Sequence, residues 1–224
     1  MQKLLFITDS LGLPRLDPEV LLDDDAWVTK VSDGLYNQFR FFQYLQAGLS
    51  SDLLVGALAS QLGAYKPDII VLQLGIVDSS PRTMTLIEKT LVGRLPGFLR
   101  NPILGFVRQH YAKIIKFRDI SYVSPDRFQS NLVTLRNYFK SAKFVVIPIA
   151  PANSEYKLKN PLIERNIDEY NRRLELVFNS DYLHSAYDGG NVEELFMKDN
   201  HHLNIVGHSV LAGNVLSLLN GSVR

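Results

Sequence analysis

The stretch Leu4-Leu5-Phe6-Ile7-Thr8-Asp9-Ser10 places four large apolar residues directly before three polar ones. Residues 68–74 and 143–150 contain apolar runs of the same kind. Such runs predict strands buried on both faces, which are typical of a parallel sheet. Residues 39–46 are rich in aromatic side chains and are predicted as a further strand, with a helix as the alternative.

The segments between these strands show mostly helical spacing of apolar residues. Helices are predicted over residues 50–65, 83–95, 106–117, 125–140, 161–179 and 204–219. Ser50 or Ser51 is a suitable N-cap for the first. Residues 11–33 contain two prolines and an aspartate triplet, which predict a loop with at most one helical turn. Alternating strands and helices predict a single domain, residues 1–224, with a three-layer α/β/α architecture around a central parallel sheet.

Composition excludes several classes of protein. Of 224 residues, 46% are hydrophobic and 21% charged, as in globular domains. The formal net charge of +1 gives no electrostatic case for nucleic-acid binding, and the absence of cysteine excludes disulfides, a thiolate nucleophile and cysteine-ligated zinc. The apolar run near the start has only four residues, against the 7–15 of a signal peptide, and no stretch reaches the roughly 18 of a membrane span. We therefore expect a soluble, cytoplasmic protein.

Two polar clusters carry the candidate chemistry. Ser10 follows a predicted strand, and a serine nucleophile needs a base, usually a histidine oriented by a carboxylate. Asp199 and His202 stand three residues apart before a predicted helix, a spacing that can place carboxylate and imidazole side by side. The alternatives are a turn or cap residue at Ser10, surface histidines, or a metal site made with the neighbouring His201.

Four short motifs, in order along nearly the whole chain, resemble those of the SGNH or GDSL-type hydrolases. The motifs are Thr8-Asp9-Ser10-Leu11, Ala47-Gly48-Leu49-Ser50-Ser51, Leu74-Gly75-Ile76-Val77-Asp78, and Asp199-Asn200-His201-His202-Leu203-Asn204 followed by Gly207-His208. The resemblance implies a flavodoxin-like α/β/α fold. It also implies Ser10 as nucleophile, His202 as base, Asp199 as the orienting acid, and an oxyanion hole formed by the N–H groups of Ser10 and Gly48. This chemistry requires no cofactor or metal.

The sequence departs from the family pattern at two positions. Thr8 replaces the first glycine, which is acceptable where the backbone is extended. Val77 replaces the asparagine that donates to the oxyanion, and loss of one such donor costs about 10²–10³ in rate.

Other polar residues follow the predicted strands. Asp78, Arg82, Arg15 and Asn153 are candidate substrate-binding residues. An arginine fork suits a carboxylate or phosphate. Surface positions for the two arginines are the alternative. His201 competes with His202 for the role of base, although the spacing Asp-x-x-His favours His202.

Residues 89–118 contain seven basic residues and no acid, interleaved with large apolar side chains. This pattern is compatible with a basic amphipathic cap that lies near anionic lipid at a membrane surface or over an anionic glycan. The alternative is an ordinary helical layer with a basic outer face. His110, alone in this segment, is interpreted as structural.

The function predicted from these features is a serine esterase or deacetylase acting on a small acyl ester, such as an acylated sugar or glycan precursor. An acyltransferase with the same triad is one alternative. A non-catalytic carbohydrate-binding protein on a degraded hydrolase fold is the other, motivated by Val77. The sequence does not distinguish among oligomeric states.

Overall fold

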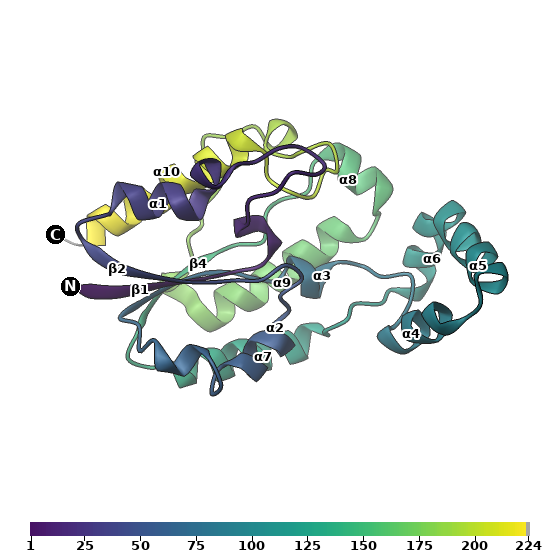
Figure 1. The fold of residues 1–224 in the computed structure, drawn as a ribbon, viewed down its shortest axis with the longest axis horizontal. Coiled ribbons are helices and arrows are strands. Elements are labelled where there is room, and N and C mark those ends of the chain that lie inside the picture. Colours follow the sequence, from purple (N-terminus) through teal and green to yellow (C-terminus); the bar gives the residue numbers. More distant parts are fainter. Residues whose placement is uncertain (223–224) are drawn as a thin grey trace.

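The computed structural model describes residues 1–222, whose centre is a four-stranded parallel sheet in the order β2-β1-β3-β4 (Figure 1). Its strands are β1 (Gln2–Thr8), β2 (Phe39–Leu45), β3 (Ile69–Gln73) and β4 (Lys143–Ile147). All four predicted strands are confirmed. Thr8 pairs with Leu45 on one side and with Gln73 on the other, so the carboxyl ends of three strands lie level.

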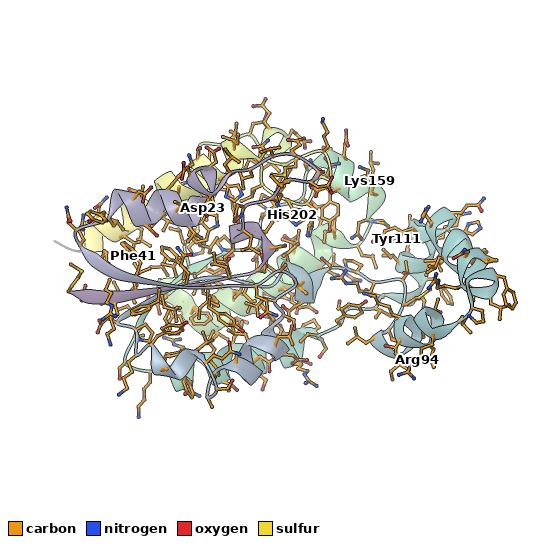
Figure 2. The ribbon with its side chains drawn as sticks, in the orientation of Figure 1. Asp23, Phe41, Arg94, Tyr111, Lys159 and His202 are labelled. Atoms are coloured by element: carbon orange, nitrogen blue, oxygen red, sulfur yellow. The ribbon has the colours of Figure 1, made fainter. Side chains whose placement is uncertain are left out.

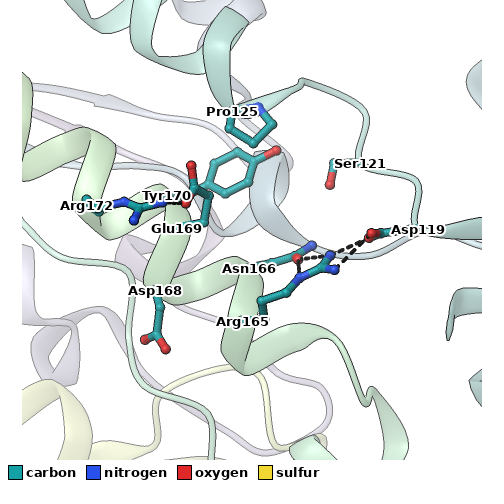
Figure 3. Close-up of a pocket in the computed structure, with 9 residues that line it drawn as sticks. All are labelled: Asp119, Ser121, Pro125, Arg165, Asn166, Asp168, Glu169, Tyr170 and Arg172. Carbon is teal, nitrogen blue, oxygen red and sulfur yellow. Dashed lines mark hydrogen bonds and ion pairs between the residues drawn. The ribbon is translucent and has the colours of Figure 1, made fainter.

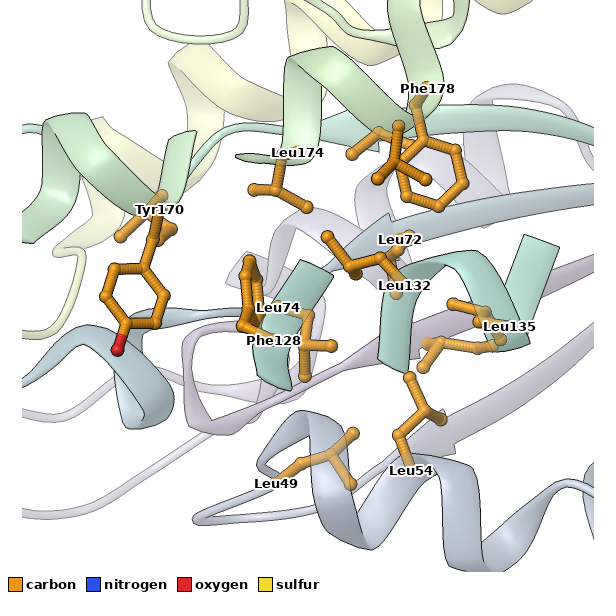
Figure 4. Close-up of a cluster of buried hydrophobic side chains, with 14 of the residues drawn as sticks. Leu49, Leu54, Leu72, Leu74, Phe128, Leu132, Leu135, Tyr170, Leu174 and Phe178 are labelled. Carbon is orange, nitrogen blue, oxygen red and sulfur yellow. The ribbon is translucent and has the colours of Figure 1, made fainter. Parts of the chain in front are cut away.

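Helices cover both faces of the sheet, as predicted (Figure 1). On one face lie α1 (Trp27–Gly34) and α10 (Ile205–Ser222), which pack with Phe6 and Val71 of the strands. On the other lie α2 (Ser51–Ala57), α7 (Pro125–Tyr138) and α9 (Ile163–Phe178). Figure 4 shows the core on this second face, where Phe128, Leu132 and Leu174 meet Leu72 of β3. Burial on both faces explains the continuous apolar character of β1 and β3.

Three helix predictions are corrected by the structure. Residues 27–34 form a helix rather than a loop, because Trp27, Val28 and Val31 share one buried face. The helix predicted to reach residue 65 ends at Ala57, and a short 3-10 helix, Leu62–Ala64, follows. The predicted N-cap of α2 is confirmed, since the Ser50 side chain accepts a hydrogen bond from the N–H of Leu53.

The third correction lies in a group of helices that projects beyond the carboxyl ends of the strands (Figure 1). These are α4 (Leu86–Arg94), α5 (Gly97–Gln109) and α6 (Tyr111–Arg118), which together we call the cap, residues 86–118. The predicted break at Asn101-Pro102 is wrong, because α5 runs through Pro102. Pro102 is the sixth residue of α5, where it removes one backbone hydrogen bond and crowds the carbonyl of Phe98, yet the helix continues to Gln109.

The remaining elements are short. They are α3 (Ile76–Ser79), α8 (Ser154–Lys159) and the 3-10 helices Ser10–Gly12, Asp23–Asp25, Asn179–Asp181 and Val192–Glu194. Within residues 1–222, no helix combines the length and apolar character needed to cross a bilayer.

Candidate active site

Ser10 lies where the strand order of the sheet reverses. The chain passes from β1 to β2 on one side and then to β3 on the other, and a crevice at the carboxyl ends of strands forms at such a point. The carboxylate of Asp9 caps the short helix Ser10–Gly12 by accepting the N–H of Leu11 at 2.9 Å. The first turn after β1 therefore holds Ser10 at the carboxyl end of this inner strand.

Thr8 and Gly12 fit against each other beside this turn. Thr8 belongs to β1, so its backbone is extended and requires no glycine, as predicted. A Cβ atom on Gly12 would lie 2.0 Å from the Thr8 Oγ1 atom. The threonine side chain therefore uses space that only glycine at position 12 leaves open.

The structure brings Ser10, His202 and Asp199 into one hydrogen-bonded chain. The Ser10 Oγ atom is 3.2 Å from His202 Nε2, and His202 Nδ1 is 2.6 Å from Asp199 Oδ2. Asp199 Oδ1 also accepts the backbone N–H groups of His201 and His202, at 2.9 and 3.0 Å. One carboxylate thus holds both the imidazole and the loop that carries it.

The electrostatics of this chain suit a general base. Burial lowers the pKa of His202 below its ordinary 6.5, although the Asp199 hydrogen bond opposes this effect. Burial would raise the pKa of Asp199, but hydrogen bonds from His202 and from the loop outweigh it and lower that pKa. At neutral pH Asp199 is therefore ionised and His202 neutral. With its proton on Nδ1, His202 presents Nε2 as acceptor for the Ser10 hydroxyl.

His201 is placed differently from its neighbour. Its ring packs edge-on against Tyr156, with centroids 5.7 Å apart, and burial lowers its pKa to about 4. Of the two histidines that competed in the sequence, His202 is the one hydrogen-bonded to Ser10. No group of three or more His, Asp or Glu side chains in residues 1–222 is arranged to hold a metal ion.

Two backbone N–H groups are available at the site. Gln46 donates its N–H to the Thr8 carbonyl at 3.1 Å, which holds the following turn beside the end of β1. Gly48 in that turn has φ +72, and nothing lies within 4 Å of the position a Cβ would take. In the described part of the chain, the N–H groups of Ser10 and Gly48 bind no protein acceptor. They can serve an oxyanion.

Two of the predicted substrate-binding residues are buried instead. The Asp78 side chain is fully buried and accepts hydrogen bonds from the N–H and the hydroxyl of Ser51, at 2.9 and 2.7 Å. Asn153 is 4% exposed, caps α8 and donates to Asn200 at 2.8 Å. Contact of these two side chains with a substrate stays a prediction. Asp78 anchors the start of α2, and Asn153 ties α8 to the loop of Asp199.

The two arginines lie against the turns of the site. Arg15 donates from Nη2 to the Ser10 carbonyl at 2.6 Å. Arg82 donates from Nη2 to the Val77 carbonyl at 3.3 Å, and its guanidinium carbon lies 4.8 Å from the centre of the Tyr122 ring. Both side chains are half-buried, which excludes the alternative of fully solvated surface arginines. Contact with a substrate stays a prediction.

A buried polar network beneath the site was not predicted from the sequence. Trp27 donates its indole N–H to Gln73 at 3.0 Å and its backbone N–H to His208 Nδ1 at 3.0 Å. Gln73 in turn donates to Tyr187 at 3.4 Å. The signals present in the sequence were a glutamine inside an apolar strand and the Gly207-His208 pair. The network joins α1 and α10 to the end of β3, next to β1.

Asp9 provides a test of burial at the site. Burial raises the pKa of Asp9 to about 7, so between pH 4 and 7 the folded protein holds a proton that the unfolded chain releases. The free energy of unfolding therefore falls as the pH rises through that range. Asp9→Asn removes this loss. Relative to wild type, the variant should gain stability with rising pH, up to roughly 4 kcal/mol.

Urea unfolding of both proteins at several pH values measures this difference, and Asp24→Asn, at an exposed aspartate, is the matched control. If the free energies of unfolding of wild type and Asp9→Asn changed with pH in parallel, the raised pKa of Asp9 would be contradicted.

Of two hollows on the surface, one lies away from Ser10, His202 and Asp199, and the other reaches Asp199. One of about 620 Å³ lies between the start of α7 and α9, where Arg165 pairs with Asp119 (Figure 3). It contains none of the three hydrogen-bonded residues. Another, of about 540 Å³, lies between the cap and α8 and reaches Asp199. Its walls include Tyr111, Tyr156 and Leu158.

Comparison with known proteins supports the fold assignment. No protein family model and no curated protein sequence matches the chain. Solved structures do match. A lipase/acylhydrolase from Enterococcus faecalis is similar over 99% of this chain and 97% of its own, with 17% identity and a TM-score of 0.68.

Two esterases give comparable values. Esterase EstA from Pseudoalteromonas sp., in a structure inhibited by monoethylphosphonate, is similar over 100% of this chain and 99% of its own, with 13% identity and a TM-score of 0.60. Axe2, an acetylxylan esterase from Geobacillus stearothermophilus, is similar over 96% and 93%, with 18% identity and a TM-score of 0.63. The chain therefore has the fold of the SGNH hydrolases, as the sequence motifs predict.

Proposed function

We propose that this protein is a serine esterase that hydrolyses small acyl esters. The observation that carries the proposal is the chain Ser10–His202–Asp199, with contacts of 3.2 and 2.6 Å, at the strand-order reversal of the sheet. A neutral imidazole between a serine hydroxyl and an ionised carboxylate is the arrangement that activates a serine.

The proposal gives each group a role. Ser10 Oγ attacks the ester carbonyl while His202 Nε2 takes its proton, and Asp199 stabilises the resulting imidazolium. The N–H groups of Ser10 and Gly48 bind the oxyanion of the tetrahedral intermediate. His202 then protonates the departing alcohol, which leaves an acyl group on Ser10. Water, deprotonated by His202, releases the acid and restores the enzyme.

The proposed substrate is an acetylated sugar or a related small acyl ester. Axe2, one of the structures with this fold, is an acetylxylan esterase. Arg15 and Arg82, half-buried beside the turns of Ser10 and Val77, add positive charge that would favour an acidic substrate. Transfer of the acyl group to a sugar hydroxyl instead of water uses the same residues, so the test includes an acceptor.

The experiment combines labelling with product analysis. Intact mass is measured after treatment with a fluorophosphonate, with Ser10→Ala alongside, and an acetylated xylooligosaccharide is then incubated with and without free sugar. We expect one adduct on wild type, none on the variant, and acetate as the product under both conditions. A labelled protein that forms acetylated sugar would be a transferase. Absence of an adduct on wild type would contradict the proposal.

Val77 predicts a specific weakness of the oxyanion hole. Its side chain has no hydrogen-bond donor, and Val77→Asn introduces one at the position where the family carries it. We expect kcat for acetyl ester hydrolysis to rise roughly tenfold or more, since removal of such a donor costs about 10²–10³. Steady-state kinetics give kcat for wild type and Val77→Asn, and thermal melting of both proteins compares their stability. A fall in kcat with unchanged melting would mean that other groups build the hole.

A further inference from the structure

The cap leaves most of its apolar side chains in contact with solvent. The exposed fractions are 91% for Phe117, 76% for Phe98, 74% for Ile87 and 60% for Phe106. Among residues 86–118, only Ile115 is buried. Phe106 and Phe117 line one shared hollow, and exposed apolar side chains that gather in this way mark an interaction site. The cap thus does not gain its stability by packing these side chains on the body.

The same surface carries a strong positive charge. The cap contains seven basic residues and one acid, a net charge of +6, so the rest of the chain carries −5 in the total of +1. The acid, Glu88, is bound on both oxygens by Arg118. The other six cations are exposed and form no ion pair with any described carboxylate. They are Lys89, Arg94, Arg100, Arg108, Lys113 and Lys116.

Apolar and basic side chains are arranged along α5 as in an interfacial helix. Leu99, Ile103 and Phe106 follow the spacing i, i+4, i+7 and share one face, with Arg100 beside that face and Arg108 opposite it. An exposed helix with aromatic and aliphatic residues on one face and basic residues around it binds in the headgroup region of a bilayer. A second copy of this chain is a poor occupant, because it would bring two surfaces of charge +6 together.

We propose that the cap docks this protein on an anionic lipid surface. The apolar side chains of the cap enter the boundary between headgroups and acyl chains, and the six exposed cations contact lipid phosphates. Figure 2 shows Arg94 and Tyr111 on the cap, which projects from the same end of the sheet at which His202 lies. Docking depends on the cap surface alone and is independent of the proposed esterase activity.

Vesicle flotation tests this proposal with the full chain. Wild type is mixed with vesicles of phosphatidylcholine, or of phosphatidylcholine with phosphatidylglycerol, at low and high salt. The charge variant is Arg94→Glu with Arg100→Glu, and the apolar variant is Phe98→Ser with Phe117→Ser. The matched charge control is Lys140→Glu with Lys143→Glu, two exposed lysines at the opposite end of the sheet.

We expect wild type to bind the anionic vesicles only, and to bind less at high salt, which shortens the screening length. The charge variant should lose at least about 25-fold in partitioning, about fivefold for each cation removed. The apolar variant should lose roughly tenfold or more. The control should stay within about twofold of wild type, because its charges lie outside the contact.

Three results would overturn the proposal. Wild type that fails to bind anionic vesicles excludes it. Equal losses in the charge variant and the control would show that only net charge matters. A wild-type dimer in solution that the apolar variant dissociates, without vesicle binding by either, would assign the surface to a second copy. Circular dichroism and activity of each variant distinguish these results from misfolding or from failure of the esterase proposal.

Discussion

Replacement of Ser10 by alanine is expected to lower kcat for acetyl ester hydrolysis by 10⁴–10⁶-fold, on the order of the losses seen when a triad serine is removed. In the proposed mechanism Ser10 Oγ forms the acyl bond, and this atom lies 3.2 Å from His202 Nε2. The methyl group of alanine provides no alternative nucleophile. Steady-state kinetics on the purified variant, with its melting temperature, measure the effect.

A neighbouring serine provides the matched control. Ser50, half-buried at the N-cap of α2, is hydrogen-bonded to the N–H of Leu53 rather than to an imidazole. Ser50→Ala should change stability by about 1 kcal/mol, as expected for loss of a cap, and leave kcat within a few-fold of wild type. If Ser10→Ala kept the kcat of wild type, Ser10 could not be the nucleophile.

Asp199→Asn should reduce kcat by about 10⁴-fold, the loss found when the acid of a Ser-His-Asp triad becomes an amide. An amide can still accept the N–H groups of His201 and His202, so the loop is expected to keep its conformation. Its NH₂ group favours the other tautomer of His202, in which Nε2 carries the proton and cannot accept one from Ser10. The effect therefore falls on kcat rather than on folding.

The pH profile separates this role from a structural one. In wild type, activity should fall as the pH drops through the pKa of His202, which burial holds below its ordinary 6.5. Removal of the Asp199 charge lowers that pKa further, so the acid limb of the variant should move to lower pH. In addition, the variant Ser10→Ala with Asp199→Asn should be no slower than Ser10→Ala alone, since triad residues act as a unit. If the acid limb of the Asp199→Asn pH profile coincided with that of wild type, the proposed role of Asp199 beside His202 would be contradicted.

The sheet was predictable because burial on both faces leaves a clear mark in the sequence. The cores of β1, β3 and β4 consist largely of aliphatic and aromatic residues, so their strands stand out without any knowledge of the partners. Helix α1 was missed because the prolines and aspartates before it dominate the local pattern. Its apolar face, Trp27, Val28 and Val31, gains meaning only from α10, which lies about 180 residues later.

The polar residues also fall into two groups: those that local motifs reveal, and those whose contacts depend on residues distant in the sequence. Ser10, Asp199 and His202 follow recognisable motifs, and the fold brings them together. Asp78 belongs to a motif as well, but its motif does not reveal that the carboxylate turns inward to Ser51. Asn153 was predicted to follow a strand directly, but β4 ends at Ile147 and Asn153 caps α8, where its partner Asn200 is distant in sequence. Sequence patterns thus predict which end of the sheet a residue occupies, while the direction of its side chain depends on long-range packing.

The contact between Thr8 and Gly12 limits which sequences this turn accepts. The two positions share one small volume, and the threonine side chain already occupies it. Glycine at position 8, as in the family motif, would free that volume and permit a larger residue at position 12. The identities at the two positions are therefore expected to vary together among relatives, with at most one side chain between them. Thr8 and Gly12 thus form a pair of positions whose side-chain volumes are expected to compensate each other.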